Sequence, residues 1–446
     1  MLESIARVKT LPITDLCKVS DGNHMSVAEY FQDEGVPYYR GQNVNTDFFL
    51  EDAQPVHIPK EIYERSYMKR SYFHAGDVLL SIVGTVGSLS LITDEIKEST
   101  GSCKLAILRP SKISPEYLSA FLMSKYGNLQ IKRNTRGAVQ TGLLLEDMNQ
   151  INVFVPDKAF ESKITTLVHS AILGNRQAKS IYSQAEEVLL AELGLTEWKP
   201  RQELAFVKRY SEVQKADRFD ADCFQPKYEE IVSAIKRYKG GSDDLGNLVK
   251  VKKSVEPGSE AYQESGIPFV RVSNLSKFEL SDNNQQFISD ELYADLKTHQ
   301  PKQGEILLSK DATLGVAYYL REKPEKMIVS GGILRLQVNG EKMLPEYLTL
   351  ALNSMVVQKQ IERDAGGSII AHWRPDQVKT TLIPLLRAER QQEIKKLVDE
   401  SFDSRIRSKS LLDIAKRGVE LAIEKDEKAA EKWIDEQTEK VNSMRV

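Results

Sequence analysis

The chain contains the same ordered set of sequence blocks twice, about 230 residues apart. The segment PEYLSAFLMS begins at Pro115, and PEYLTLALNS begins at Pro345. Other pairs of blocks occur in the same order with nearly the same spacing. Ordered matches of this kind are typical of an internal repeat, so we expect a duplicated module.

The repeated blocks predict a mixed α/β module. GVPYYRGQNV from Gly35 matches GIPFVRVSNL from Gly266, and AGDVLLSIVGTVG from Ala75 matches QGEILLSKDATLG from Gln303. Aromatic and β-branched residues favour strands, and the glycines between two apolar stretches predict a hairpin. The PEYL segments predict helices, because proline is tolerated in the first helical turn. Each module should therefore combine twisted strands with one or two helices.

A long segment without proline follows each module. ESKITTLVHSAILG from Glu161 matches QQEIKKLVDESFDS from Gln391. Apolar and small residues recur there at heptad spacing, which predicts a coiled coil. Because small residues let helix backbones approach closely, we expect the two helices to pack together. The alternative is that each helix caps only its own module. The expected contact positions, called the seam below, are Ile164, Leu167, Ala171, Ala178, Ile181, Ala185, Ile394, Leu397, Ser401, Ser408, Leu411 and Ala415.

The predicted fold class is α+β. Two similar mixed α/β domains are separated by a pair of long antiparallel coiled-coil helices, with pseudo-two-fold symmetry. The expected segments are domain 1 at 1–156, long helix 1 at 157–200, domain 2 with an entry segment at 201–385, and long helix 2 with a helical tail at 386–446. In the tail, Trp433 and Ile434 either cover the end of the helix pair or dock a partner, and we favour docking.

Composition excludes some classes of protein. A length of 446 residues, with 41% hydrophobic and 28% charged residues, is typical of a globular chain of two or three domains. No apolar run is long enough to cross a bilayer, and the first residues lack the apolar core of a secretory leader. The three cysteines form no CxxC pair, which predicts reduced thiols and a cytoplasmic location.

Motifs for chemistry are missing from the sequence. We find no GxxxxGK phosphate loop, no Asn-Pro-Pro-Tyr or Asp-Pro-Pro-Tyr and no GxSxG. PDKAFESK from Pro156 resembles a nuclease signature, but the gap between Asp157 and Glu161 is short. Acidic residues there suit a helix N-terminus instead. The histidines lack metal-ligand spacing, and His372 is interpreted as a polar loop residue. We therefore predict a non-catalytic chain with no catalytic, metal-binding or cofactor-binding residues.

The order of blocks resembles the DNA-specificity subunit of type I restriction–modification systems. The resemblance covers residues 10–424 and rests on YYRGQNV and FVRVSNL, on GDVLLS and GEILLS, on both PEYL helices, and on the heptad helices. The segment KADRFDADCFQPKYEEIV from Lys215 also resembles the entry to a recognition domain of this family. The first half has no equally clear counterpart of that entry.

The resemblance implies a function in sequence-specific DNA binding. Family members read a bipartite site in double-stranded DNA, with one half-site per target recognition domain and an unspecific spacer between. They recruit two adenine methyltransferase subunits, largely through the long helices, and translocating endonuclease subunits are optional further partners. S-adenosylmethionine belongs to the methyltransferase, so no cofactor is expected in this chain.

Cations and amides in loops are the candidate DNA contacts, because these groups bind phosphates and base edges. The loops NTRGAVQTG and DAGGSIIAHWR are the preferred recognition elements, since their glycines allow close approach. The candidates are Arg40, Lys69, Arg70, Lys104, Arg133, Arg136, Gln140, Arg271, Asn274, Lys310, Arg363 and Arg374. Two rival functions remain open at this stage: a scaffold that assembles proteins without DNA, and a stand-alone DNA-modifying enzyme.

Overall fold

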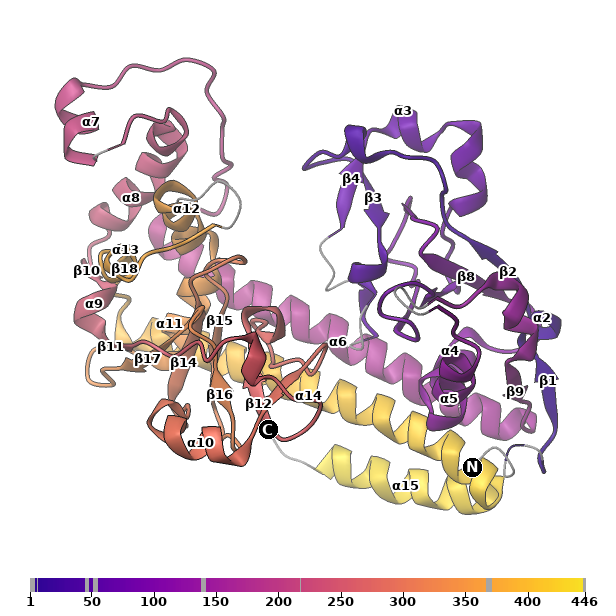
Figure 1. The fold of residues 1–446 in the computed structure, drawn as a ribbon. Coiled ribbons are helices and arrows are strands. Elements are labelled where there is room, and N and C mark those ends of the chain that lie inside the picture. The colour runs from indigo at the N-terminus through magenta and orange to yellow at the C-terminus, as the bar shows by residue number, and fades with distance from the viewer. Residues whose placement is uncertain are drawn as a thin grey trace. The chain divides into compact units, whose positions relative to one another are not determined.

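The computed structural model describes residues 5, 7–44, 48–50, 55–137, 142–216, 218–365 and 371–443. The chain forms two compact units (Figure 1). Unit 1 comprises Met1–Gln177 with Asp403–Val446, and unit 2 comprises Ala178–Phe402. Both boundaries fall inside long helices, so each unit contains part of each helix. The units therefore cut across the four predicted segments, whose bounds stay a prediction.

The described residues of unit 1 form three small sheets. The first is antiparallel and has the order β2-β8-β5-β6; the second has the order β4-β3-β7, with β3 and β7 parallel; the third pairs β1 with β9. The strands are β1 (Thr10–Pro12), β2 (Cys17–Asp21), β3 (Val36–Tyr39), β4 (Val56–Ile58), β5 (Val78–Ser81), β6 (Leu89–Leu91), β7 (Thr100–Gly101), β8 (Leu105–Pro110) and β9 (Asn152–Phe154).

Unit 2 repeats this topology strand for strand. Its sheets have the orders β11-β17-β14-β15, β13-β12-β16 and β10-β18. The duplication predicted from the sequence blocks is thus confirmed in three dimensions. The strands are β10 (Ser242–Asp244), β11 (Val249–Lys252), β12 (Ile267–Val270), β13 (Gln286–Ile288), β14 (Glu305–Ser309), β15 (Ala317–Tyr319), β16 (Ile328–Val329), β17 (Ile333–Val338) and β18 (Leu382–Pro384).

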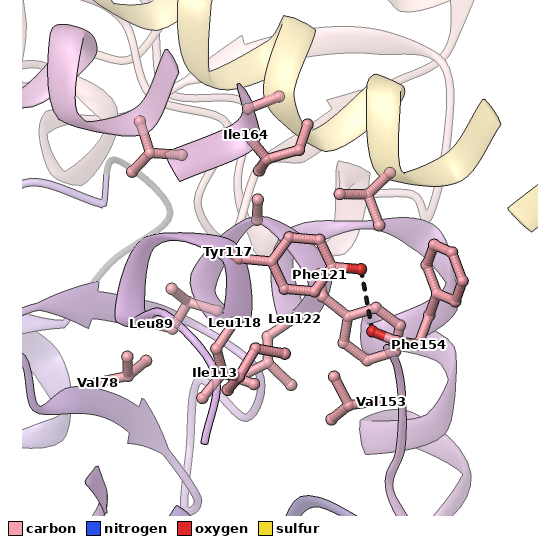
Figure 2. Close-up of a cluster of buried hydrophobic side chains, with 14 of the residues drawn as sticks. Val78, Leu89, Ile113, Tyr117, Leu118, Phe121, Leu122, Val153, Phe154 and Ile164 are labelled. Carbon is pink, nitrogen blue, oxygen red and sulfur yellow. Dashed lines mark hydrogen bonds between the residues drawn. The ribbon is translucent and has the colours of Figure 1, made fainter. Parts of the chain in front are cut away.

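The PEYL segments form helices α4 (Pro115–Met123) and α11 (Pro345–Asn353), as predicted. The tyrosine of each motif is fully buried and donates a hydrogen bond to a strand carbonyl. The bond runs from Tyr117 Oη to Phe154 O at 3.0 Å in unit 1, and the equivalent distance in unit 2 is 2.7 Å. Figure 2 shows this bond among the apolar side chains that α4 packs against the sheet and the long helix. The polar end of each tyrosine thereby fixes the helix against its sheet.

The two long helices are α6 (Lys158–Leu193) and α14 (Ala388–Glu424). Within unit 1 they run antiparallel, because Ile164 lies against Gly418 while Gly174 lies against Ser408. A Cβ on Gly174 would lie only 2.5 Å from Ser408 Oγ. The small residue therefore allows the close approach that the sequence predicted.

The same antiparallel register continues within unit 2. Ser401 Oγ donates to Ala178 O at 2.6 Å, and Arg390 Nε donates to Glu192 Oε1 at 2.8 Å. All the predicted seam residues are buried except Leu397, which is half-buried. The packing of the two helices against each other is confirmed, whereas the pseudo-two-fold relation of the domains stays a prediction.

Asp157 lies at the start of α6, where its carboxylate accepts a hydrogen bond from Phe160 N at 2.8 Å. Glu161 accepts from Ser114 N at 2.9 Å and thereby ties α6 to α4. Both carboxylates thus have the helix-start role that the sequence favoured.

The helical tail forms α15 (Glu427–Ser443) within unit 1. Ile434 is 1% exposed and lies against Gly418 of α14, and Trp433 is half-buried on the same core. The preference for partner docking by these two residues is therefore wrong for Ile434, because the helix pair already buries this side chain. The sequence alone does not show which face of the tail helix packs against the long helices.

Shorter helices complete the two units. They are α2 (Ile13–Leu16), α3 (Lys60–Tyr63), α5 (Lys125–Arg133), α7 (Tyr210–Ala216), α8 (Pro226–Arg237), α9 (Leu245–Leu248), α10 (Asp290–Leu296), α12 (Met355–Asp364) and α13 (Pro375–Lys379). Among the described residues, no helix has the length and apolar character that a membrane crossing requires.

Candidate nucleic-acid interface

A cavity of about 560 Å³ opens in unit 1 beside the tip of the β5–β6 hairpin. Two of the predicted DNA contacts, Arg40 and Lys104, line it together with His24, Phe31 and Gly84. β5 and β8 are neighbours in one sheet, and Gly41, which follows Arg40, lies against Val83 O and Lys104 Cβ. The fold thus brings together cations that are 64 residues apart in the sequence.

Arg40 follows β3 and is only half-exposed. Its guanidinium lies 5.7 Å from the centre of the Phe31 ring, which is a cation–π distance. Within the described part of the chain, Arg40 Nε has no hydrogen-bond partner. A half-exposed arginine held against an aromatic ring is suited to binding an anion or a base edge.

Backbone hydrogen bonds join Arg136 to Gly142 and the next residue to the hairpin. Arg136 and Gly142 exchange two backbone hydrogen bonds of 2.8 Å, and Leu143 N donates to Ile82 O at 2.9 Å. The Arg136 side chain is 63% exposed, and its guanidinium pairs with the Asp147 carboxylate. This ion pair orients the arginine, while most of its surface stays accessible.

The other predicted DNA contacts of unit 1 differ in how exposed they are and in whether an acid already pairs with them. Lys69, Lys104 and Arg133 are exposed. Arg70 is also exposed, but it pairs with Asp21, whose other carboxylate oxygen lies 2.6 Å from His24 Nε2. Gln140, the predicted base reader, lies outside the described residues. The exposed cations therefore belong to different loops, and the cavity joins only part of the predicted set.

In unit 2 the corresponding hairpin tip carries a mixed-charge cluster. Lys310 Nζ lies 2.5 Å from Asp311 Oδ2, and His372 Nδ1 lies 2.7 Å from Asp311 Oδ1. Burial by itself would raise the pKa of the Asp311 carboxyl. The hydrogen bonds from Lys310 and His372 outweigh that effect and leave the pKa below its usual value. Asp311 is therefore an ionised acceptor near neutral pH.

Arg271 and Asn274 occupy the positions that Arg40 and Asn43 have in unit 1. Asn274 is 1% exposed, its Oδ1 accepts from Arg271 N at 3.0 Å, and its Nδ2 donates to Asn283 O at 2.8 Å. This amide is therefore buried and already bonded within the protein, and its contact with DNA stays a prediction. Arg271 is half-exposed and donates to Asn284 O at 2.8 Å.

The remaining candidates of unit 2 are two arginines that pair with nearby acids. Arg363 Nε donates to Asp364 Oδ1 at 2.6 Å, and Arg374 lies 3.3 Å from Asp376. Arg374 is the more exposed of the two. The sequence reasoning missed Asp311 and interpreted His372 as an isolated polar residue. The sequence KDATLG shows Asp311 beside Lys310. It does not show that His372, 61 residues later, contacts this acid.

The comparison with known protein families matches the two halves of the repeat separately. The family model for the type I restriction modification DNA specificity domain matches residues 6–172 and again residues 242–412. The crystal structure of a type I restriction-modification system S subunit from M. genitalium is 11% identical and covers 98% of this chain and 96% of its own, with a TM-score of 0.35. The HsdS subunit from Thermoanaerobacter tengcongensis is 14% identical and covers 96% of both chains, with a TM-score of 0.29. No curated protein matches the chain.

Proposed function

Because the chain belongs to the type I restriction modification DNA specificity family, we propose that it selects the DNA sequence on which such a complex acts. Each unit would read one half of a bipartite site in double-stranded DNA. The observation that carries this proposal is the exact repetition of strand order with different side chains at the hairpin tips. A repeated scaffold with divergent tips suits two half-sites of different sequence.

The chemistry of the tips supports contact with DNA. In unit 1, Arg40 and Lys104 line the cavity, and the exposed Lys69 and Arg133 would add phosphate contacts. In unit 2, Lys310 provides the cation of the tip. Affinity would come mainly from phosphates, whereas sequence preference would come from the side chains at the tips.

The chain would itself be non-catalytic. It would act in the cytoplasm by selecting the DNA sequence and by holding the other subunits together. Two methyltransferase subunits would bind along the long helices and supply S-adenosylmethionine, and endonuclease subunits would be optional. Leu173 on α6 and Ile406 on α14 are 48% and 55% exposed and are apolar side chains that such a partner would cover.

A selection from random DNA duplexes tests the proposal. The purified full-length chain, with its methyltransferase partner present, should enrich one motif made of two different half-sites and an unspecific spacer of fixed length. Lys104→Ala should weaken selection in one half-site and Lys310→Ala in the other. Failure to enrich any motif would favour a scaffold that assembles proteins without DNA. Methyl transfer by the purified chain alone would favour a stand-alone enzyme.

A further inference from the structure

The tip of the β14–β15 hairpin in unit 2 is held in one conformation. Trp373 N donates to Lys310 O at 2.8 Å, and Ala312 N donates to Ala371 O at 3.0 Å. Ala312 has a φ of 59°, a left-handed conformation that alanine rarely adopts. Backbone strain of this kind persists only where surrounding contacts enforce it, and it is concentrated at functional sites.

The charged cluster on this tip is not needed to hold the backbone. In unit 1 the equivalent positions are Ile82 and Val83, and the equivalent of His372 is Gly142. The backbone bridge between tip and loop nevertheless forms in both units, between Val83 and Gly142 and between Asp311 and His372. Side chains that the repeated scaffold does not require have another role.

The cluster also has unused hydrogen-bonding capacity. An ionised carboxylate offers about four lone-pair sites, and a lysine ammonium offers three donors. His372 and Lys310 each occupy part of the capacity of Asp311, whose side chain is 25% exposed, while the Lys310 side chain is 20% exposed. Both groups can therefore bind a ligand without breaking their own pair.

The neighbouring Lys310 ammonium also makes an acidic residue compatible with DNA. An unpaired carboxylate at the tip would be repelled by phosphates, whereas Asp311 lies 2.5 Å from Lys310 Nζ. The pair presents an acceptor next to a donor. In the major groove a G·C pair presents the complement, since cytosine N4 donates and guanine O6 and N7 accept. N4 and O6 are about 2.9 Å apart, because they are hydrogen-bonded to each other.

We propose that Lys310 and Asp311 together read one G·C base pair in the half-site of unit 2. This inference rests on the proposed function and adds a specific base pair to it. Asp311 accepts a hydrogen bond from the cytosine amino group, and Lys310 donates to the guanine acceptors. An A·T pair also presents a donor beside an acceptor, but G·C is favoured because guanine offers the lysine ammonium two acceptors, O6 and N7, on one base, whereas adenine offers only N7.

His372 acts as a positioning residue for this contact. Its ring holds Asp311 Oδ1 at 2.7 Å and thereby leaves Oδ2 and the spare lone pairs for lysine and base. Asparagine can replace this donor, whereas alanine cannot. His372→Asn should therefore keep the base preference that His372→Ala loses.

The experiment repeats the duplex selection with full-length variants. Asp311→Ala should lower the preference at one base pair about tenfold, as expected for loss of one specific side-chain contact. That pair should be G·C in the wild-type motif, and the other half-site should be unchanged. His372→Ala should relax the same pair, and His372→Asn should restore it. Asp290→Ala is the matched control, because Asp290 is 79% exposed and pairs only loosely, at 3.6 Å, with Lys326.

The other outcomes separate the inference from the proposed function. An unchanged motif for Asp311→Ala, relaxation at an A·T pair, or equal relaxation in both half-sites overturns the inference while bipartite recognition stands. The inference is also overturned if His372→Asn relaxes the base preference as much as His372→Ala does. A wild-type chain that enriches no motif overturns the proposed function, and the inference falls with it.

Discussion

The contact between Asn175 and Arg405 offers a quantitative test of the helix pair. These residues occupy equivalent positions in the two repeats and meet inside unit 1, where Arg405 Nη1 donates to Asn175 Oδ1 at 3.0 Å. Asn175 is 1% and Arg405 6% exposed. A hydrogen bond to a charged group contributes about 1.5–3 kcal/mol. Asn175→Ala should therefore lower the free energy of unfolding by at least about 1.5 kcal/mol.

A double-mutant cycle isolates the contact from other effects of each substitution. The cycle compares Asn175→Ala, Arg405→Met and the double variant by urea unfolding, followed by circular dichroism at 222 nm. We expect a coupling energy of at least about 1.5 kcal/mol, with an unchanged dependence on urea. Asn149→Ala, at an exposed site, should change stability by less than about 0.5 kcal/mol. A coupling energy below about 0.5 kcal/mol would refute the argument that this contact holds α6 against α14.

Three further predictions concern the tips and the attachment of unit 2 to its helix. Ala312→Gly should raise the free energy of unfolding by up to about 1 kcal/mol, because glycine removes the left-handed strain but loses more entropy on folding. A lower free energy of unfolding in urea would contradict this prediction. Burial would raise the pKa of Asp399, but hydrogen bonds from Lys395 and Arg321 outweigh it and lower that pKa. Because the folded pKa is below the unfolded one, this stabilisation is present at neutral pH and is lost on acidification. Asp399→Asn should thus show a smaller loss of stability than wild type between about pH 6 and pH 3, and equal losses would exclude the ion pair as a cause. Arg136→Ala should weaken DNA binding: a uniform loss with a shallower salt dependence identifies a phosphate contact, relaxation at one base pair identifies readout, and an unchanged electrophoretic titration removes the assignment.

The duplicated fold was predictable from the sequence because the repeated blocks carry backbone-determining features. The proline at the start of each PEYL helix, the glycines at hairpin tips and the small residues of the seam all restrict what the backbone can do. Gly174 illustrates the point, since its lack of a side chain allows the contact with Ser408. Local signals of this kind survive in both copies, so one copy supports the interpretation of the other.

The candidate interface was less predictable, because burial and pairing depend on contacts distant in sequence. Asn274 corresponds to Asn43 in the first repeat, and we predicted a DNA contact for Asn274 because it is an amide in a loop. The structure shows instead that both amides accept from the backbone N–H of the preceding arginine, so the repetition reflects a shared turn. The charged cluster at Asp311 likewise includes His372, which comes from another loop 61 residues away.

Mapping of adenine methylation across a genome tests most directly whether this chain determines which DNA sequence is methylated. Cells that carry the chain with its methyltransferase should contain one bipartite motif methylated throughout. The same cells without the chain should lose that methylation, and Asp311→Ala should broaden only one half of the motif. Methylation of the same motif in the absence of the chain would contradict the account.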